Sequence, residues 1–376
     1  MDKLIAFSIS DLIREIEASE ELINKTTIPF ELISYKDWLL NSLVEIKKEL
    51  NRIKYYLRIS KQDPDIILAN TTDLFRYRNI FRILNTVYIP LLVRIIPTDY
   101  LALKFINWLH QEHKQTKGHP FIITNGDFGI YPSKDSPIRY HLPITSQVSL
   151  LHFPLLFHEF GHLLFIKHKE EMIDIIKDFQ TKLNNIIDLP IQKFENKNQP
   201  EVRKRSDIIE TWYEWMEELF CDAVGLTIGG SSYLNAFSHF IRFSGSSTYF
   251  VPEKDLAKRS HPVSWLRVRL LVERASKIAE LKNESIELLN DWQKIANTLK
   301  IKEEYFGYYN KDFHLEIVSA LDDMLIETDP IQFQNYMDKN NSSNLIELLN
   351  ESWDRFKTEP DMYNFWEKEI IKKIVK

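Results

Sequence analysis

Apolar residues recur three and four positions apart along most of the chain, with polar residues at the positions between them. This spacing places the apolar side chains on one face of a helix and predicts amphipathic helices. The helices expected in the first part of the chain cover residues 11–22, 34–57, 73–88 and 101–113. Those expected later cover residues 148–186, 201–227, 261–300 and 311–327. Two segments rich in glycine and serine, GGSSY (229–233) and SGSSTY (244–249), are expected to be loops.

The helical pattern is interrupted between residues 120 and 146. The sequence PFIITNGDFGIYPSKDSPIRYHLPITS mixes β-branched and aromatic residues with turn signals such as Asn125-Gly126, which predicts two or three short strands. The whole pattern therefore predicts an α+β fold that is predominantly α-helical and contains one small sheet. We expect a helical N-terminal region (residues 1–115), a core with the sheet (116–280) and a helical C-terminal region (281–376).

Titratable residues interrupt the nearly apolar segment LLFHEFGHLLF (155–165). On a helix, His158 and His162 lie on one face with Cβ atoms roughly 5–6 Å apart, so both imidazoles can bind one zinc ion. Glu159 is then placed to act as a general base toward a water molecule. The alternative is a pair of core histidines that hydrogen-bond with their neighbours. Because burying ionisable groups without partners is costly, the pattern favours a metal site.

A catalytic zinc ion usually has three protein ligands, and the sequence offers two candidates for the third. The first is His168, which has the outer spacing of the HExxHxxGxxH motif, although Phe165 stands at the glycine position. A continuous helix carries His168 about 9 Å along its axis beyond His162. His168 is therefore the less favoured candidate.

The second candidate is the segment WYEWMEELFCDAVGL (212–226), which has the apolar stripe of a helix. Glu214, Glu218 and Asp222 recur every four residues on another face of that helix. Three carboxylates in register repel one another unless a cation lies beside them. This face therefore points to a metal ion.

The ordered motifs resemble those of the gluzincin metallopeptidases, in which HExxH is followed on a second helix by ExxxD. The matching residues here are Glu218 and Asp222. The resemblance implies a zincin-like core in which Glu218 completes the zinc site formed by the two histidines. It also implies that Asp222 orients a ligand histidine.

A third motif, HPVSWLR (261–267), is similar to the HPxxxxR element of zinc peptidases related to the CAAX-prenyl and heat-shock membrane proteases. The resemblance implies that His261 or Arg267 stabilises the oxyanion of the reaction or holds the glutamate face. The alternative is the start of a helix, with Pro262 in its first turn and Arg267 on the surface. Those relatives span membranes, whereas no run here reaches the roughly 18 apolar residues of a spanning helix. Their membrane substrates are therefore not expected here.

Composition and charge argue against several classes of partner and cellular location. The formal net charge of −6 over 376 residues gives no basic field, so nucleic acid is not an expected partner. The single cysteine, Cys221, forms no intramolecular disulfide and fits a reducing compartment. The N-terminal segment lacks the apolar region of a secretory signal. We expect a cytoplasmic protein without membrane insertion.

These observations predict a zinc-dependent metallopeptidase that hydrolyses a protein or peptide substrate, with Glu159 as the general base. The segment Ile138–Ser146 is expected to form the sheet edge that binds the substrate as an added strand, unless it is an internal strand. One alternative is a binding or regulatory protein with a structural metal, whose fourth position is closed by Glu214, Glu217 or His152. Another is a toxin or immunity effector protease that acts only after a trigger.

Overall fold

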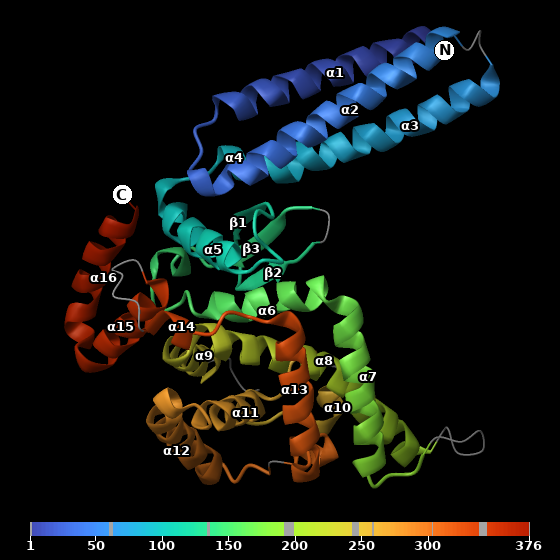
Figure 1. The fold of residues 1–376 in the computed structure, drawn as a ribbon. Coiled ribbons are helices and arrows are strands. Elements are labelled where there is room, and N and C mark those ends of the chain that lie inside the picture. Colours follow the sequence, from blue (N-terminus) through green and yellow to red (C-terminus); the bar gives the residue numbers. More distant parts are fainter. Residues whose placement is uncertain are drawn as a thin grey trace. The chain divides into compact units, whose positions relative to one another are not determined.

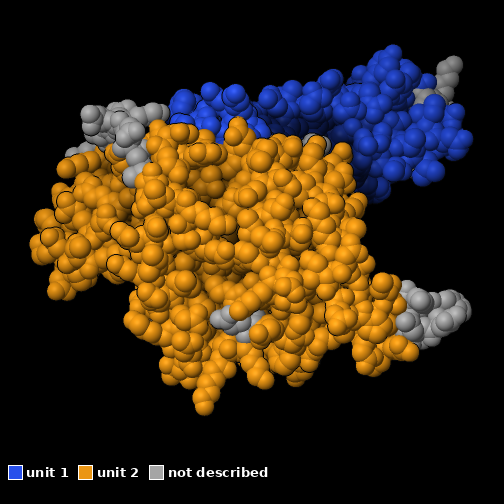
Figure 2. All heavy atoms as spheres, turned by 60° about the horizontal axis from the view of Figure 1, so that its bottom comes forward, with its two compact units in different colours: residues 1–127, 135–148, 375 blue, residues 128–134, 149–374, 376 orange. Residues whose placement is uncertain are grey.

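The computed structural model describes the following residues: 2–59, 63–133, 136–191, 199–242, 248–257, 259–302, 304–337 and 344–375. The chain is mostly helical with three short strands (Figure 1), which confirms the predominantly α-helical α+β class. It forms two compact units, coloured separately in Figure 2. Unit 1 holds residues 1–127, 135–148 and 375, and unit 2 holds residues 128–134 and 149–374.

Unit 1 begins with three long helices that pack side by side (Figure 1). The helices of this unit are α1 (Asp2–Lys25), α2 (Ile33–Ile59), α3 (Pro64–Ile83), α4 (Ile89–Val93) and α5 (Tyr100–Glu112). The apolar stripe of α2 is buried at every turn from Tyr35 to Leu57, because this helix contacts both α1 and α3. Helix α3 starts where Asp63 accepts a hydrogen bond of 3.0 Å from the backbone N–H of Asp65.

The strands are β1 (Phe121–Asn125), β2 (Gly129–Tyr131) and β3 (Ile138–Leu142). They follow the order β1-β3-β2. Strands β1 and β3 are parallel, with Phe121 opposite Ile138 and Asn125 opposite Leu142. The expectation that Ile138–Ser146 forms the sheet edge is therefore wrong, because β3 is the central strand. Burial on alternate residues of β3 does not reveal which strands pair with it.

The later helices are α6 (Leu155–Lys167), α7 (Lys169–Ile186), α8 (Pro200–Gly229), α9 (Ser231–Arg242), α10 (Glu253–Leu256), α11 (Ser264–Ser276), α12 (Lys282–Thr298), α13 (His314–Thr328), α14 (Gln334–Met337), α15 (Leu345–Thr358) and α16 (Pro360–Val375). The helix predicted over residues 148–186 is divided at His168, which has φ −112° and ψ 31° and separates α6 from α7. The predicted helix over 261–300 likewise forms α11 and α12.

The segment GGSSY, expected to be a loop, contains the start of a helix. Gly230, with φ 55°, ends α8, and α9 begins at the next residue. A single glycine in the left-handed region is enough for this turn, so the following serines are free to start a helix. Residues 243–247, which include most of SGSSTY, lie outside the described residues.

No single helix in the described part of the chain is long and apolar enough to cross a membrane. The pair Pro64–Val93 and Pro97–Glu112 reaches the required length and composition only when its two parts, bent by 86°, are taken together.

Helices α6 and α8 form the centre of unit 2 and pack closely along each other. Helix α6 is buried on nearly every side, as its apolar sequence predicts. Gly161 permits the close approach, because a Cβ atom at this position would lie 2.7 Å from the Cα atom of Cys221 on α8. The two helices therefore meet at the positions that carry the candidate metal ligands.

Candidate metal centre

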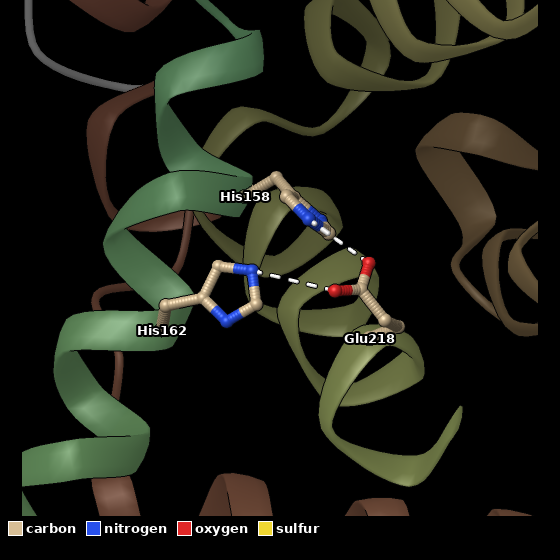
Figure 3. A group of neighbouring side chains, drawn as sticks. All are labelled: His158, His162 and Glu218. Carbon is tan, nitrogen blue, oxygen red and sulfur yellow. Dashed lines mark ion pairs between the residues drawn. The ribbon is translucent and has the colours of Figure 1, made fainter. Parts of the chain in front are cut away.

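His158 and His162 project from α6 toward Glu218 on α8 (Figure 3). The Nε2 atom of His158 lies 3.4 Å from Oε2 of Glu218, and the Nε2 atom of His162 lies 3.6 Å from Oε1. The three side chains are 12%, 19% and 8% exposed, respectively. Each residue offers one ligand atom within 4.8 Å of the others, so the group is positioned to bind a metal ion.

The spacing of these atoms matches a small tetrahedral site. Metal–nitrogen bonds of about 2.0–2.1 Å at tetrahedral angles place neighbouring ligand atoms about 3.3 Å apart. The observed separations of 3.4 and 3.6 Å are close to this value, and they end on the two different oxygens of Glu218. With one ligand atom taken from each residue, the three atoms lie within 4.8 Å of one another, so side-chain adjustment can bring them around an ion of the size of zinc.

Each histidine also faces a second carboxylate with its other ring nitrogen. The Nδ1 atom of His158 lies 2.9 Å from Oδ1 of Asp222, and the Nδ1 atom of His162 lies 2.9 Å from Oε1 of Glu217. The contact of His162 is a hydrogen bond, whereas Nδ1 of His158 makes no hydrogen bond within the described residues and lies only at ion-pair distance from Asp222. An Nδ1 proton directed at a carboxylate leaves the Nε2 lone pair free to bind a metal. Both imidazoles are thus oriented with Nε2 toward Glu218, as metal ligands require.

Asp222 is fixed by two further side chains. Arg267 donates hydrogen bonds of 2.8 and 2.7 Å to its two carboxylate oxygens, and the hydroxyl of Tyr233 donates one of 3.1 Å to Oδ1. Burial raises the pKa of Asp222, but the charge of Arg267 outweighs this effect and holds the pKa below its usual value. Asp222 is therefore a rigid, ionised partner for His158.

The charges of the site favour a cation. Burial raises the pKa of Glu218, but contact with His158 and the charge of Arg267 lower it below its usual value, so Glu218 is ionised. Its buried Oε2 atom makes no hydrogen bond within the described part of the chain, although Arg267 lies 3.4 Å away. Burial lowers the pKa of His158, yet Asp222 and Glu218 outweigh it and raise the pKa to about 10. The surrounding carboxylates thus favour positive charge between His158 and Glu218.

The structure brings both residues of the third motif to Glu218. The Nε2 atom of His261 lies 3.3 Å from Oε1 of Glu218, and the His261 side chain is 53% exposed. Burial lowers the pKa of His261, and Glu218 opposes that effect only in part. Arg267 has a side chain only 9% exposed, so it is not the surface residue of the alternative interpretation. Arg267 contacts both carboxylates from a buried position, while the His261 ring is open to solvent.

Glu159 follows His158 directly on α6 and is half-buried. Within the described ranges, its carboxylate makes no hydrogen bond and no ion pair with another side chain. This distinguishes it from Glu217, Glu218 and Asp222, which all contact histidine or arginine. Its carboxylate is therefore available to accept a proton.

The other candidate ligands lie elsewhere. Helix α6 continues to Lys167, and the Nδ1 atom of His168 lies 3.3 Å from Oε1 of Glu327 on α13. His168 forms with Glu171 and Glu327 a second, more exposed group that is positioned to bind a metal ion. Glu214 is exposed on α8. Neither His168 nor Glu214 joins the group formed by His158, His162 and Glu218.

Helix α9 supplies two site residues that the sequence interpretation missed. Tyr233 binds Asp222, and the ring of Phe237 stacks against His158 with centroids 6.5 Å apart and planes at 26°. Gly225 makes room for Tyr233, because a Cβ atom there would lie 2.3 Å from its ring. A glycine inside a predicted helix was the available signal for such close packing.

Replacing Gly161 with alanine is expected to weaken the contact between α6 and α8. The added Cβ would clash with the backbone of Cys221, which lowers the free energy of unfolding by about 1–3 kcal/mol and weakens zinc binding. Urea denaturation and zinc titration against a chelator measure the two effects. Gly126→Ala is the control, because its Cβ would meet only the His141 side chain, at 3.2 Å. Equal stability of the two variants would contradict this prediction.

Tyr233→Phe is expected to weaken zinc binding by up to about tenfold, because Asp222 loses a donor and orients His158 less firmly. Competitive zinc titration checks this value. Tyr35→Phe is a matched control: Tyr35 is equally buried, but its hydroxyl donates to the carbonyl of Tyr88 in unit 1. If both variants bind zinc like the wild type, Tyr233 has no part in orienting the ligands.

No family model matches the chain, and no curated protein or solved structure matches it either. Its function is therefore inferred from the residues of the site.

Proposed function

We propose that this protein is a zinc-dependent metallopeptidase with a zincin-like core that hydrolyses peptide bonds of a protein or peptide. One observation carries the proposal. His158 and His162 direct Nε2 toward Glu218 at 3.4 and 3.6 Å, while an unpaired carboxylate, Glu159, lies next to the first ligand. A metal site and a free general base on the same helical turn are the parts that metal-assisted hydrolysis requires.

Each residue of the site has a distinct role in this proposal. His158, His162 and Glu218 would hold zinc, which when bound supplies a Lewis acid and lowers the pKa of water to roughly 7. Glu159 accepts the proton of the attacking water on its carboxylate and then delivers it to the leaving nitrogen. Asp222 and Glu217 lie against the Nδ1 atoms of the two histidines and orient their rings.

The third motif supplies two distinct roles. Arg267 binds both oxygens of Asp222 and contacts Glu218, so it acts as a positioning residue. His261 has an exposed ring beside Glu218 and is the residue that can reach the oxyanion of a substrate. Both assignments follow from the half-exposed position of His261 and the buried position of Arg267.

A catalytic site is favoured over a structural one because no fourth ligand closes the group within the described residues. Glu217, one candidate for that position, already contacts the Nδ1 atom of His162. His152, another candidate, packs edge-on against Phe128 with centroids 6.5 Å apart. The absence of a fourth ligand among the described residues supports hydrolysis and argues against a purely structural metal.

An extended peptide is the substrate that the neighbouring elements accommodate best. Strand β2 is an outer strand of the sheet, and it contacts α6 within unit 2. A peptide that adds to a sheet edge gains main-chain hydrogen bonds whatever its sequence. The β2 edge therefore supports a peptide as the substrate and replaces the edge expected at Ile138–Ser146.

The test compares new protein N-termini in cells that express the wild type with those in cells that express Glu159→Gln. Zinc-loaded wild-type protein is also incubated with a proteome-derived peptide library. The expected result is a set of cleavages that is present with the wild type and absent with Glu159→Gln. A regulatory protein with a structural metal would give identical profiles in both assays. A triggered effector protease would cleave in cells under its trigger but leave the library intact.

A further inference from the structure

Aromatic rings from three elements of unit 2 lie near the metal centre. Phe237 stacks on His158, and Phe240 follows it by one turn on α9. The ring of Phe240 packs edge-on against Phe128, with centroids 5.7 Å apart and planes at 81°. Phe128 in turn packs edge-on against His152 at 88°. We call the four residues Phe128, His152, Phe237 and Phe240 the aromatic ledge.

The ledge joins the three elements that surround the candidate site. Phe128 directly precedes β2, His152 precedes α6 by a short turn, and the two remaining phenylalanines belong to α9. A peptide bound along β2 must therefore pass beside Phe128. Helices α6 and α9 also contact each other, and Phe237 joins the ledge to the ligand His158.

The exposed part of the ledge is apolar and uncharged. Phe240 is 51% exposed, whereas Phe237 is buried between the Tyr233 ring and the Arg267 guanidinium. Burial, and to a lesser extent the charge of His239, lower the pKa of His152, so its ring is neutral near pH 7. A half-exposed phenylalanine that is anchored by other rings offers a rigid surface for another apolar group.

We propose that the aromatic ledge binds a large apolar side chain, preferably aromatic, of the peptide substrate close to the scissile bond. This inference rests on the proposed peptidase function and names its substrate class. A bound aromatic ring can make edge-to-face contacts with Phe128 and Phe240, and a branched aliphatic side chain can pack against the same rings. A charged side chain would lose hydration against the same surface without gaining a partner.

Phe240→Ser tests the proposal, with Phe250→Ser as the matched control. Phe250 is 49% exposed and packs against Phe306 instead of the ledge. Phe240→Leu keeps an apolar side chain and is expected to retain part of the preference. Circular dichroism and thermal unfolding establish that each variant folds, which is expected because Phe240 is half-exposed.

The readout is the residue frequency on each side of the cleavage sites that zinc-loaded protein produces in a proteome-derived peptide library. We expect Phe, Tyr and Leu to be enriched at one position for the wild type and for Phe250→Ser. Phe240→Ser is expected to reduce kcat/KM for Phe-containing peptides by about tenfold or more relative to Ser-containing peptides. Fluorescence anisotropy of the same labelled peptides with Glu159→Gln protein gives an activity-independent measure of binding.

The outcomes separate this inference from the proposed function. Cleavage without an apolar preference, or an unchanged preference in Phe240→Ser, would contradict substrate binding by the aromatic ledge. Either result would leave the proposed peptidase activity standing. Absence of any cleavage beyond that of Glu159→Gln, in the library and in cells, would overturn both.

Discussion

Glu159→Gln is expected to keep its full zinc content and to lose about 10²–10⁴-fold in kcat. The reason is that glutamine at this position cannot accept the proton of the attacking water, while His158, His162 and Glu218 remain in place to hold the metal. Metal analysis and steady-state kinetics on a peptide identified from the library measure the two properties separately.

Glu170→Gln is the control for this substitution. Glu170 is an exposed glutamate on α7, and replacing it with glutamine changes the net charge by the same amount. It is expected to behave like the wild type. Unchanged turnover in Glu159→Gln would assign the proton transfer to another residue, whereas loss of zinc would show that Glu159 acts on the metal centre itself.

Glu218→Ala is expected to weaken zinc binding by more than about 100-fold, because it removes a direct ligand and not an outer partner. It also removes the buried carboxylate that faces both histidines. His168→Ala is expected to leave zinc affinity and activity unchanged, since His168 contacts Glu327 and lies outside the group. Zinc titration of the two variants decides between the two third-ligand candidates.

The zinc affinity of Asp222→Asn is expected to lie between those of Glu218→Ala and His168→Ala, lowered about 10–100-fold. Asp222 lies against Nδ1 of His158, not against the Nε2 atom that would bind the metal, and it also binds Arg267 through both oxygens. The same substitution is expected to lower the free energy of unfolding by about 3–5 kcal/mol, because it breaks a buried ion pair. Zinc lost from His168→Ala and retained by Glu218→Ala would reverse the ligand assignment.

Local patterns were sufficient for the parts of the site that lie within one helix. The apolar surroundings of HExxH predicted a buried helix, and α6 is buried on nearly all sides. The four-residue spacing of Glu214, Glu218 and Asp222 predicted a shared helix face. Glu218 and Asp222 contact His158, whereas Glu214 is exposed and lies outside the group. These features depend on helical geometry, which the sequence spacing determines.

Features that depend on distant contacts were not predictable in the same way. Arg267 and Asp222 are 45 residues apart, and only the resemblance to the HPxxxxR element indicated Arg267 as a residue that holds the glutamate face; the spacing alone does not identify the pair. Strand β3 alternates buried and half-buried residues, a pattern that fits either an edge strand or a central strand, so its central position was not predicted. The segment GGSSY predicted a loop because glycine and serine are typical of turns. In the structure Gly230 alone makes the turn, and α9 begins at Ser231.

The decisive measurement is an anomalous-difference map at the zinc absorption edge from crystals of the zinc-loaded protein. We expect one strong peak within about 2.0–2.2 Å of ligand atoms of His158, His162 and Glu218, and no peak at this position in the His158→Ala/His162→Ala double variant. A map with no density there, or with zinc only at His168, Glu171 and Glu327, would contradict the proposed metal centre.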